Sequence, residues 1–276
     1  MPLLEHLVEL RQRMVRTFIA IIVLFFISYY FAPTIYTFLV QPLSDIVHQQ
    51  GGSQRLIYTA LHEAFFTYVK VAFFTALFLG FPFMAIQLWK FVAPGLYRNE
   101  KKALLPFLVF TPILFFMGGA MAYYVVFPLA WKFFLGFQTV GTTDTLAIQL
   151  EAKVGEYLSL VMRLIFAFGL CFELPVIMTL LARVGIVSSK GMREKRKYAI
   201  VFAFVAAAVL TPPDVISQIM LAVPTMILYE ISIFAAMAVE RQRGEDPNAA
   251  TDDLDDDDDD DEDDPAKKDG AGDYGP

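Results

Sequence analysis

The sequence is poor in the side chains on which enzymes and metal sites depend. Its 276 residues include one cysteine and three histidines, and the histidines are far apart. The single Cys171 lies in an apolar run, which excludes an intramolecular disulfide and a cysteine-based metal site. The chain also lacks a GxxxxGKS/T phosphate loop, an HExxH pair and a serine-hydrolase constellation. We therefore predict that it is not an enzyme and that it holds no metal and no cofactor.

Charged residues are scarce as well. Only 18% of the chain is charged and 57% is hydrophobic, with a mean hydropathy of +0.52, whereas soluble domains are about a quarter charged. The apolar residues form long runs, and a run of about 20 residues is enough to span a bilayer as a helix. The sequence therefore predicts an all-α integral membrane protein. Its predicted transmembrane helices are residues 17–36, 66–89, 103–131, 155–182, 198–211 and 215–239.

The last two of these six helices are predicted to be short. Residues 198–211 would be about 21 Å long as a helix, which is less than the thickness of a typical hydrocarbon core. The sequence "TPPD" at 211–214 then forces a break, because neither proline can donate a backbone hydrogen bond. Pro224 lies inside the final segment. Residues 17–239 are therefore predicted to form one six-helix transmembrane domain.

Two polar segments flank this domain. In residues 1–16, Leu3, Leu7, Leu10 and Met14 recur at helical spacing, which predicts an amphipathic helix on the cytoplasmic surface. Residues 244–276 carry 16 acidic side chains against two lysines. Such a segment repels itself and has almost nothing apolar to bury, so it is predicted to be a disordered cytoplasmic tail. It is either a plain solvated tail or an electrostatic lure for basic partners.

The distribution of Lys and Arg predicts the orientation. Fifteen Lys and Arg residues lie in the segments on one side of the predicted topology. These segments are the amino-terminal one and those that follow the second, fourth and sixth helices. The opposite loops carry only Arg55, Lys132 and Lys153. Because basic loops stay in the cytoplasm, both termini are predicted to be cytoplasmic.

Two acidic residues stand in segments that this rule makes basic. Glu100 lies in "FVAPGLYRNEKK" at 91–102, and Glu9 lies in the amino-terminal segment. Glu9 has a simple alternative, an i,i+4 pair with Arg13, which would contribute only a few tenths of a kcal/mol.

A third acid, Glu173, lies within a predicted span, two residues before Pro175. A carboxylate at that depth costs a few kcal/mol unless it is protonated, paired or hydrated. It is either a protonated group satisfied by a neighbouring helix or a polar patch that hydrates the membrane or receives a polar group of a partner.

Four motifs give the sequence a family resemblance. In this order and spacing they resemble the TatC family, the receptor subunit of the twin-arginine protein translocase, over about residues 3–240. They are "HLVELRQR" (6–13), "WKFVAPGLYRNEKK" (89–102), "FGLCFELPV" (168–176) and "LTPPDVISQ" (210–218). The acidic tail is not part of that pattern. The resemblance implies a concave, glove-like bundle of six helices whose last two are short.

The resemblance also implies the function and the site residues. Members of the family bind the twin-arginine signal peptides of folded precursor proteins. The matching positions assign Glu9 and Glu100 to the two arginines of the signal, with Arg11, Arg13, Phe91 and Pro94 shaping the site. They make Glu173 the intramembrane acid that meets a partner, and they make Pro42, Asp214 and Gln218 sensitive positions.

The implied partners are single-span subunits of the TatA and TatB type, the lipid bilayer and further copies of the chain, with no nucleic acid. The implied location is the bacterial inner membrane. Two other classes of membrane protein fit the sequence less well. A secondary transporter is expected to show inverted repeats, and none is visible in the sequence. An intramembrane enzyme would need a nucleophile or a metal set, which the sequence does not offer.

Overall fold

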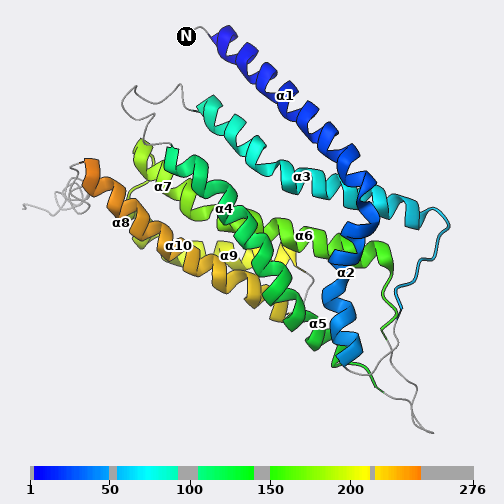
Figure 1. The fold of residues 1–276 in the computed structure, drawn as a ribbon. Coiled ribbons are helices and arrows are strands. Elements are labelled where there is room, and N and C mark those ends of the chain that lie inside the picture. The colour runs from blue at the N-terminus through cyan, green and yellow to red at the C-terminus, as the bar shows by residue number, and fades with distance from the viewer. Residues whose placement is uncertain (1–2, 50–54, 93–104, 140–149, 212–214, 244–276) are drawn as a thin grey trace, which may run out of the picture.

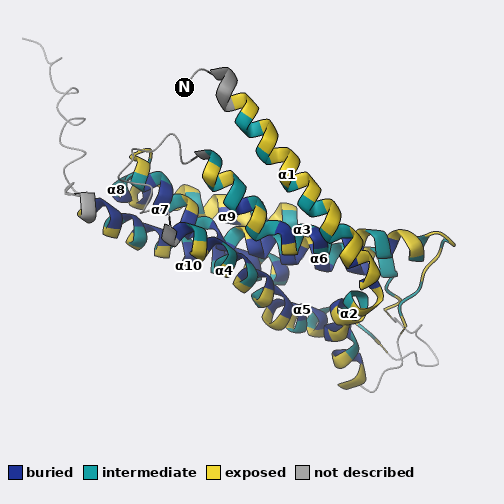
Figure 2. Ribbon diagram, turned by 45° about the horizontal axis from the view of Figure 1, so that its top comes forward, coloured by how far each residue is buried: buried dark blue, intermediate teal, exposed yellow. Residues whose placement is uncertain are grey.

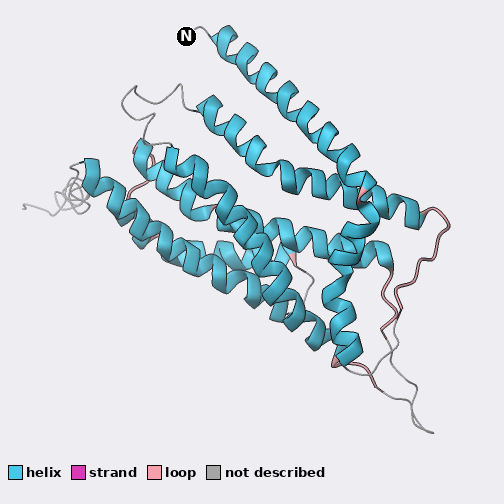
Figure 3. Cartoon of the chain, in the orientation of Figure 1, coloured by secondary structure: helices cyan, strands magenta, loops and turns pink. Residues whose placement is uncertain are grey.

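The described part of the chain folds as helices. A computed structural model describes residues 3–49, 55–92, 105–139, 150–211 and 215–243. Its elements are α1 (Leu3–Tyr30), α2 (Ala32–Gln49), α3 (Glu63–Val92), α4 (Leu105–Met121), η3 (Ala122–Val126), α5 (Phe127–Leu135), α6 (Val154–Phe172), α7 (Leu174–Val184), α8 (Ser189–Glu194), α9 (Arg196–Leu210) and α10 (Val215–Arg243). Within these ranges there is no strand (Figure 3), and an isolated bridge joins Ile57 to Lys153. The predicted all-α class is confirmed.

Among the described residues, five helical segments are long and apolar enough to cross a membrane. They are Leu7–Tyr30, Glu63–Phe91, Phe107–Leu135, Val154–Val184 and Val215–Arg241. The helix at the place of the predicted fifth span is α9, which has only 15 residues and is therefore about 22 Å long. The count of six spans stays a prediction.

The amino-terminal region is one continuous helix. The predicted boundary between residues 16 and 17 falls inside α1, which runs unbroken to Tyr30. The chain changes helix at Phe31, and Pro33 lies in the first turn of α2. Proline is well tolerated there because a donor in the first turn has no intrahelical partner.

Helix α1 stands at one edge of the bundle (Figure 1), where it packs chiefly against α3. Helices α4 and α6 lie at the centre, and α10 packs against α7 and α9. Most residues of α1 are exposed, whereas the buried residues are concentrated in the other helices (Figure 2). Exposed apolar residues such as Phe18 and Phe26 are expected in a helix that faces lipid, because hydrocarbon does not disfavour them as water does.

The central helices approach so closely that their backbones touch. A Cβ atom added to Gly118 of α4 would lie 2.5 Å from the carbonyl oxygen of Phe168 in α6, and one added to Gly169 would lie 2.7 Å from the ring of Phe115. Phe115 and Phe168 are themselves fully buried. Small residues at this crossing therefore set the distance between α4 and α6.

An apolar hollow of ≈ 510 Å³ lies between α2, α3, α4 and α6. Its walls include Phe38, Phe74, Phe78 and Tyr123. The helices thus enclose a concave surface.

Candidate functional site

A groove lies between α1 and α3 near the start of α1 and the end of α3. Its volume is ≈ 310 Å³. Its lining residues are Leu10, Arg13, Met14, Thr17, Phe18, Ile21, Met84, Gln87, Leu88 and Phe91. The groove is almost entirely apolar, and Arg13, Thr17 and Gln87 supply its polar groups. It can therefore take an apolar segment that carries a small number of polar side chains.

A polar network of three residues crosses this groove. Two nitrogens of the Arg13 guanidinium, Nη2 and Nε, donate to the same oxygen of Glu9, Oε1. The distance from Nε to Oε1 is 3.1 Å. The Nη1 atom of Arg13 donates to Oε1 of Gln87 on α3 at 3.4 Å. The side chains of Arg13 and Glu9 are 18% and 29% exposed, so a ligand in the groove can reach both. The i,i+4 pair of Glu9 with Arg13, an alternative that the sequence left open, is present.

Glu173 lies in a buried polar chain at the middle of the bundle. Its side chain is 4% exposed and hydrogen-bonds with Thr111, whose hydroxyl oxygen accepts from Nε1 of Trp89 at 3.3 Å. Its Oε1 atom has no hydrogen-bond partner among the described residues. A buried oxygen without a hydrogen-bond partner costs free energy of folding. A polar group of a partner could therefore bind favourably at this carboxyl group.

Glu173 lies at the junction of two helices. It ends α6 and precedes α7, whose first turn contains Pro175. Proline has no N–H to continue the helical hydrogen-bond ladder, so the ladder is interrupted here, with the acid at the junction. The break places Leu174 in the wall of a neighbouring cavity.

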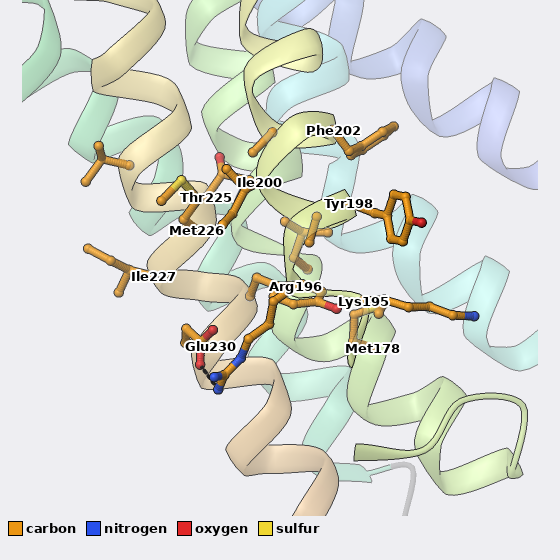
Figure 4. Close-up of a pocket in the computed structure, with 15 residues that line it drawn as sticks. Met178, Lys195, Arg196, Tyr198, Ile200, Phe202, Thr225, Met226, Ile227 and Glu230 are labelled. Atoms are coloured by element: carbon orange, nitrogen blue, oxygen red, sulfur yellow. Dashed lines mark hydrogen bonds and ion pairs between the residues drawn. The ribbon is translucent and has the colours of Figure 1, made fainter. Parts of the chain in front are cut away.

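That second cavity lies between α7, α9 and α10 and has a volume of ≈ 560 Å³. Figure 4 shows its apolar wall, with Ile200 and Phe202 of α9 and Ile227 of α10. At one end Arg196 donates to Glu230 at 2.6 Å. The cavity is thus apolar along the membrane-facing part of short α9 and charged at its end.

No arrangement of these residues suggests metal chemistry. In the described part of the chain, no group of three or more His, Cys, Asp or Glu side chains is placed to hold a metal ion.

Comparison with known proteins identifies the family. The family model described as Sec-independent protein translocase protein (TatC) matches residues 5–224. The chain belongs to the TatC family. The predicted resemblance is therefore confirmed, and with it the prediction of a multi-pass membrane protein from a family of transport receptors rather than enzymes.

Individual TatC proteins resemble the chain over most of its length. The Sec-independent protein translocase protein TatC of Magnetococcus marinus is 53% identical over 265 residues, covering 92% of this chain and 94% of that protein. That of Escherichia coli K12 is 42% identical, covering 84% and 87%. The crystal structure of the twin-arginine translocase receptor TatC is 36% identical, with a TM-score of 0.72, and covers 86% of this chain and 100% of its own.

The structure brings together part of the site expected of a TatC protein. Glu9, Arg13 and Phe91 lie at the groove, whereas Arg11 is exposed on α1 and does not line it. Glu100, Pro94 and Asp214 lie outside the described residues. Gln218 lies near the start of α10 and is half-buried.

Pro42 has a structural role that can be read from its neighbours. It is buried inside α2, and it cannot donate to the carbonyl oxygen of Phe38 four residues earlier. The Tyr123 hydroxyl donates to that oxygen instead, at 2.7 Å. Pro42 thereby creates an acceptor that joins α2 to η3.

Sequence reasoning missed two polar residues of the described structure. Gln87 lies within an apolar span, and that position was the available signal for its role across the groove. Glu240 is buried near the end of α10 and accepts hydrogen bonds from the backbone N–H and the hydroxyl of Ser189. It fastens α8 to α10, and nothing in its sequence neighbourhood marks that contact.

Proposed function

We propose that the chain is the receptor subunit of a twin-arginine translocase and that the groove between α1 and α3 binds the signal peptide of a folded precursor. In this proposal Glu9 and Glu100 accept the two arginines, while the apolar wall takes neighbouring side chains of the signal. In this proposal the groove faces the cytoplasm from a bacterial inner membrane and both termini lie in the cytoplasm, as the distribution of Lys and Arg predicts.

The observation that supports this proposal is the way Glu9 already holds a guanidinium. Nη2 and Nε of Arg13 both donate to one oxygen of Glu9, Oε1, so Glu9 accepts a guanidinium at this groove, although not through the two-oxygen fork. A guanidinium fork matches a carboxylate in a way that a lysine ammonium does not. A charged hydrogen bond of this kind contributes roughly 1.5–3 kcal/mol when buried and less at a half-exposed site.

Partner subunits belong to the same proposal. Single-span subunits of the TatA and TatB type are expected to reach the polar group at Glu173, which directly precedes a residue lining the apolar cavity beside α9. Self-association in the working complex is part of the proposal. Export is driven by the proton-motive force, since the sequence carries no phosphate loop for nucleotide hydrolysis.

Binding of matched signal peptides to the solubilised full-length chain tests the receptor role. A peptide with two arginines is expected to bind at least about tenfold more tightly than the same peptide with two lysines, because each lost bidentate contact costs on the order of 1 kcal/mol. Fluorescence anisotropy of a labelled peptide measures both affinities. Equal affinities for the two peptides would show that the chain does not read arginine.

A further inference from the structure

A polar cavity of ≈ 830 Å³ opens at the other end of the bundle, between the first turns of α3 and α6. One stripe along each helix lines it, because residues spaced three, four and seven apart share a helical face. The stripes consist of Glu63, Thr67 and Lys70 on α3 and of Glu156, Ser159 and Arg163 on α6. The groove and the buried acid described above do not involve this cavity.

The two helices begin level with each other. The backbone N–H of Gly155, at the start of α6, donates to Oε1 of Glu63, at the start of α3, at 3.4 Å. Lys70 is seven residues into α3 and Arg163 is nine residues beyond Val154, so their backbones lie about 10 and 14 Å from the helix starts. The two cations are therefore at similar depth on facing stripes.

The acids of the cavity are already occupied. Glu63 accepts hydrogen bonds from the backbone N–H groups of Thr59, at 2.8 Å, and of Gly155. Glu156 pairs with Lys153 at 3.5 Å. In the part of the chain that the structure describes, neither Lys70 nor Arg163 takes part in an ion pair, and both side chains are exposed. The cavity thus ends in two cations that lack a counter-ion.

The depth of Lys70 and Arg163 in the membrane determines which group can pair with them. Helix α3 has 30 residues and is about 45 Å long, which exceeds a hydrocarbon core of about 30 Å. With the helix centred, the backbones of Lys70 and Arg163 lie only about 3–6 Å below the edge of that core. Lysine and arginine stems of that length extend their charges to the level of the lipid phosphates.

We propose that this cavity binds the headgroup of an anionic phospholipid from the leaflet that faces away from the cytoplasm. Lys70 and Arg163 hold the phosphodiester from two sides. Ser159 donates its hydroxyl proton to Gly155, so its oxygen can accept from an uncharged, hydroxyl-bearing head such as glycerol. The cavity lining carries three cations, Lys70, Lys153 and Arg163, against two acids, Glu63 and Glu156. Its net charge is positive, so it favours a net negative lipid over one whose choline or ethanolamine head adds a cation.

Lipid retention by the purified full-length chain tests the site. The protein is reconstituted in an equimolar mixture of phosphatidylglycerol and phosphatidylcholine, extracted in mild detergent, and analysed by native mass spectrometry. The wild type is expected to retain phosphatidylglycerol in preference to phosphatidylcholine. Lys70→Gln with Arg163→Gln is expected to lower phosphatidylglycerol retention about tenfold, because both charge-assisted contacts are lost.

Two matched variants separate the site from general charge. Arg55→Gln with Lys132→Gln removes two exposed cations from the same side of the membrane but leaves Lys70 and Arg163 in place, and retention should stay at the wild-type level. Lys70→Arg with Arg163→Lys preserves both charges and should also retain the lipid. Should the double glutamine variant fail to fold, the two single variants carry the test, each with a several-fold loss.

The outcomes that overturn the proposal are specific. Unchanged phosphatidylglycerol retention in the glutamine variants, or equal retention of both lipids by the wild type, shows that the cavity is not an anionic headgroup site. If millimolar inorganic phosphate displaces the lipid, the two cations form a site for a free anion, and the proposal of a lipid site is wrong. If retention falls equally in the variant with Arg55→Gln and Lys132→Gln, the lipid is held by general surface charge and not by this cavity.

Discussion

At the scale of single residues, the groove presents a carboxylate that is engaged before any ligand arrives. Glu9 holds Arg13, and Arg13 also reaches Gln87 on the facing helix. A signal arginine that binds Glu9 must replace or share this contact, so the net gain is smaller than the energy of the bond itself. Under the proposed function, a second carboxylate at Glu100 supplies the remaining discrimination.

Reversing the charge of Glu100 is expected to weaken signal binding sharply. Glu100→Lys places a cation where an arginine would dock, and the loss should be at least about tenfold at low salt and smaller at high salt, because salt screens exposed charges. Anisotropy titrations with a twin-arginine peptide at two ionic strengths measure it. The control is a peptide in which an acid replaces one arginine, which should recover affinity for the variant. If the variant binds the twin-arginine peptide as tightly as the wild type at low salt, Glu100 is only a solvated loop residue.

Removing the carboxyl group of Glu173 is expected to affect partners rather than signals. Glu173→Ala deletes the buried acceptor whose Oε1 atom has no partner among the described residues, so co-purification of single-span subunits should fall while signal binding persists. Glu173→Gln, which keeps an acceptor oxygen in the same place, is the matched control and should recover part of the association. Partner yields that match the wild type in the alanine variant would remove this role.

At the scale of secondary-structure elements, the bundle is held by close approach at its centre and by single polar contacts at its edges. Helices α4 and α6 touch through glycine, while Tyr123 closes the backbone gap left by Pro42. At the central crossing an added methyl group would overlap backbone atoms of the facing helix. Changes of one methyl group at the central crossing therefore matter more than larger changes on lipid-facing α1.

Adding a methyl group at the crossing of α4 and α6 is expected to destabilise the protein. In Gly118→Ala the new Cβ would lie 2.5 Å from the Phe168 carbonyl oxygen, and a backbone atom cannot move aside cheaply, so the expected cost is about 1–3 kcal/mol. Thermal unfolding in detergent measures it. Gly80→Ala is the control, since its Cβ meets the end of a flexible leucine side chain at 3.3 Å. An unchanged melting temperature for Gly118→Ala would show that this crossing is not close-packed.

At the scale of the whole molecule, charge is separated along the chain. Lys and Arg gather in the segments of one predicted side, whereas 16 acids follow α10 in residues 244–276. The polyacidic segment has almost no apolar surface to bury. It is therefore predicted to contribute solubility and long-range electrostatics rather than packing energy.

Deleting residues 249–276 is expected to leave folding and membrane insertion unchanged. The reason is that the composition of the deleted residues predicts almost no apolar burial, while the spans that drive insertion lie between Leu7 and Arg241. Membrane fractionation and thermal unfolding of the truncated chain check this. Disappearance of the truncated protein from the membrane fraction would mean that the tail is structural.

The sequence by itself determined the properties that add up along the chain. Apolar runs are a local sum, so the all-α membrane class and the long spans could be predicted without any contact. The pairing of Glu9 with Arg13 was also within reach, because four residues on one helix are always neighbours.

Only the tertiary structure decided which side chains from different helices meet. The contact of Arg13 with Gln87 joins positions 74 residues apart, and the contact of Ser189 with Glu240 joins positions 51 apart. Lys70 and Arg163 look like isolated anomalies in two separate spans until α3 and α6 are placed level with each other. Hydropathy carries no information about such pairs, because the rotation and height of each helix are set by packing, and at the central crossing that packing is decided by Gly118 and Gly169.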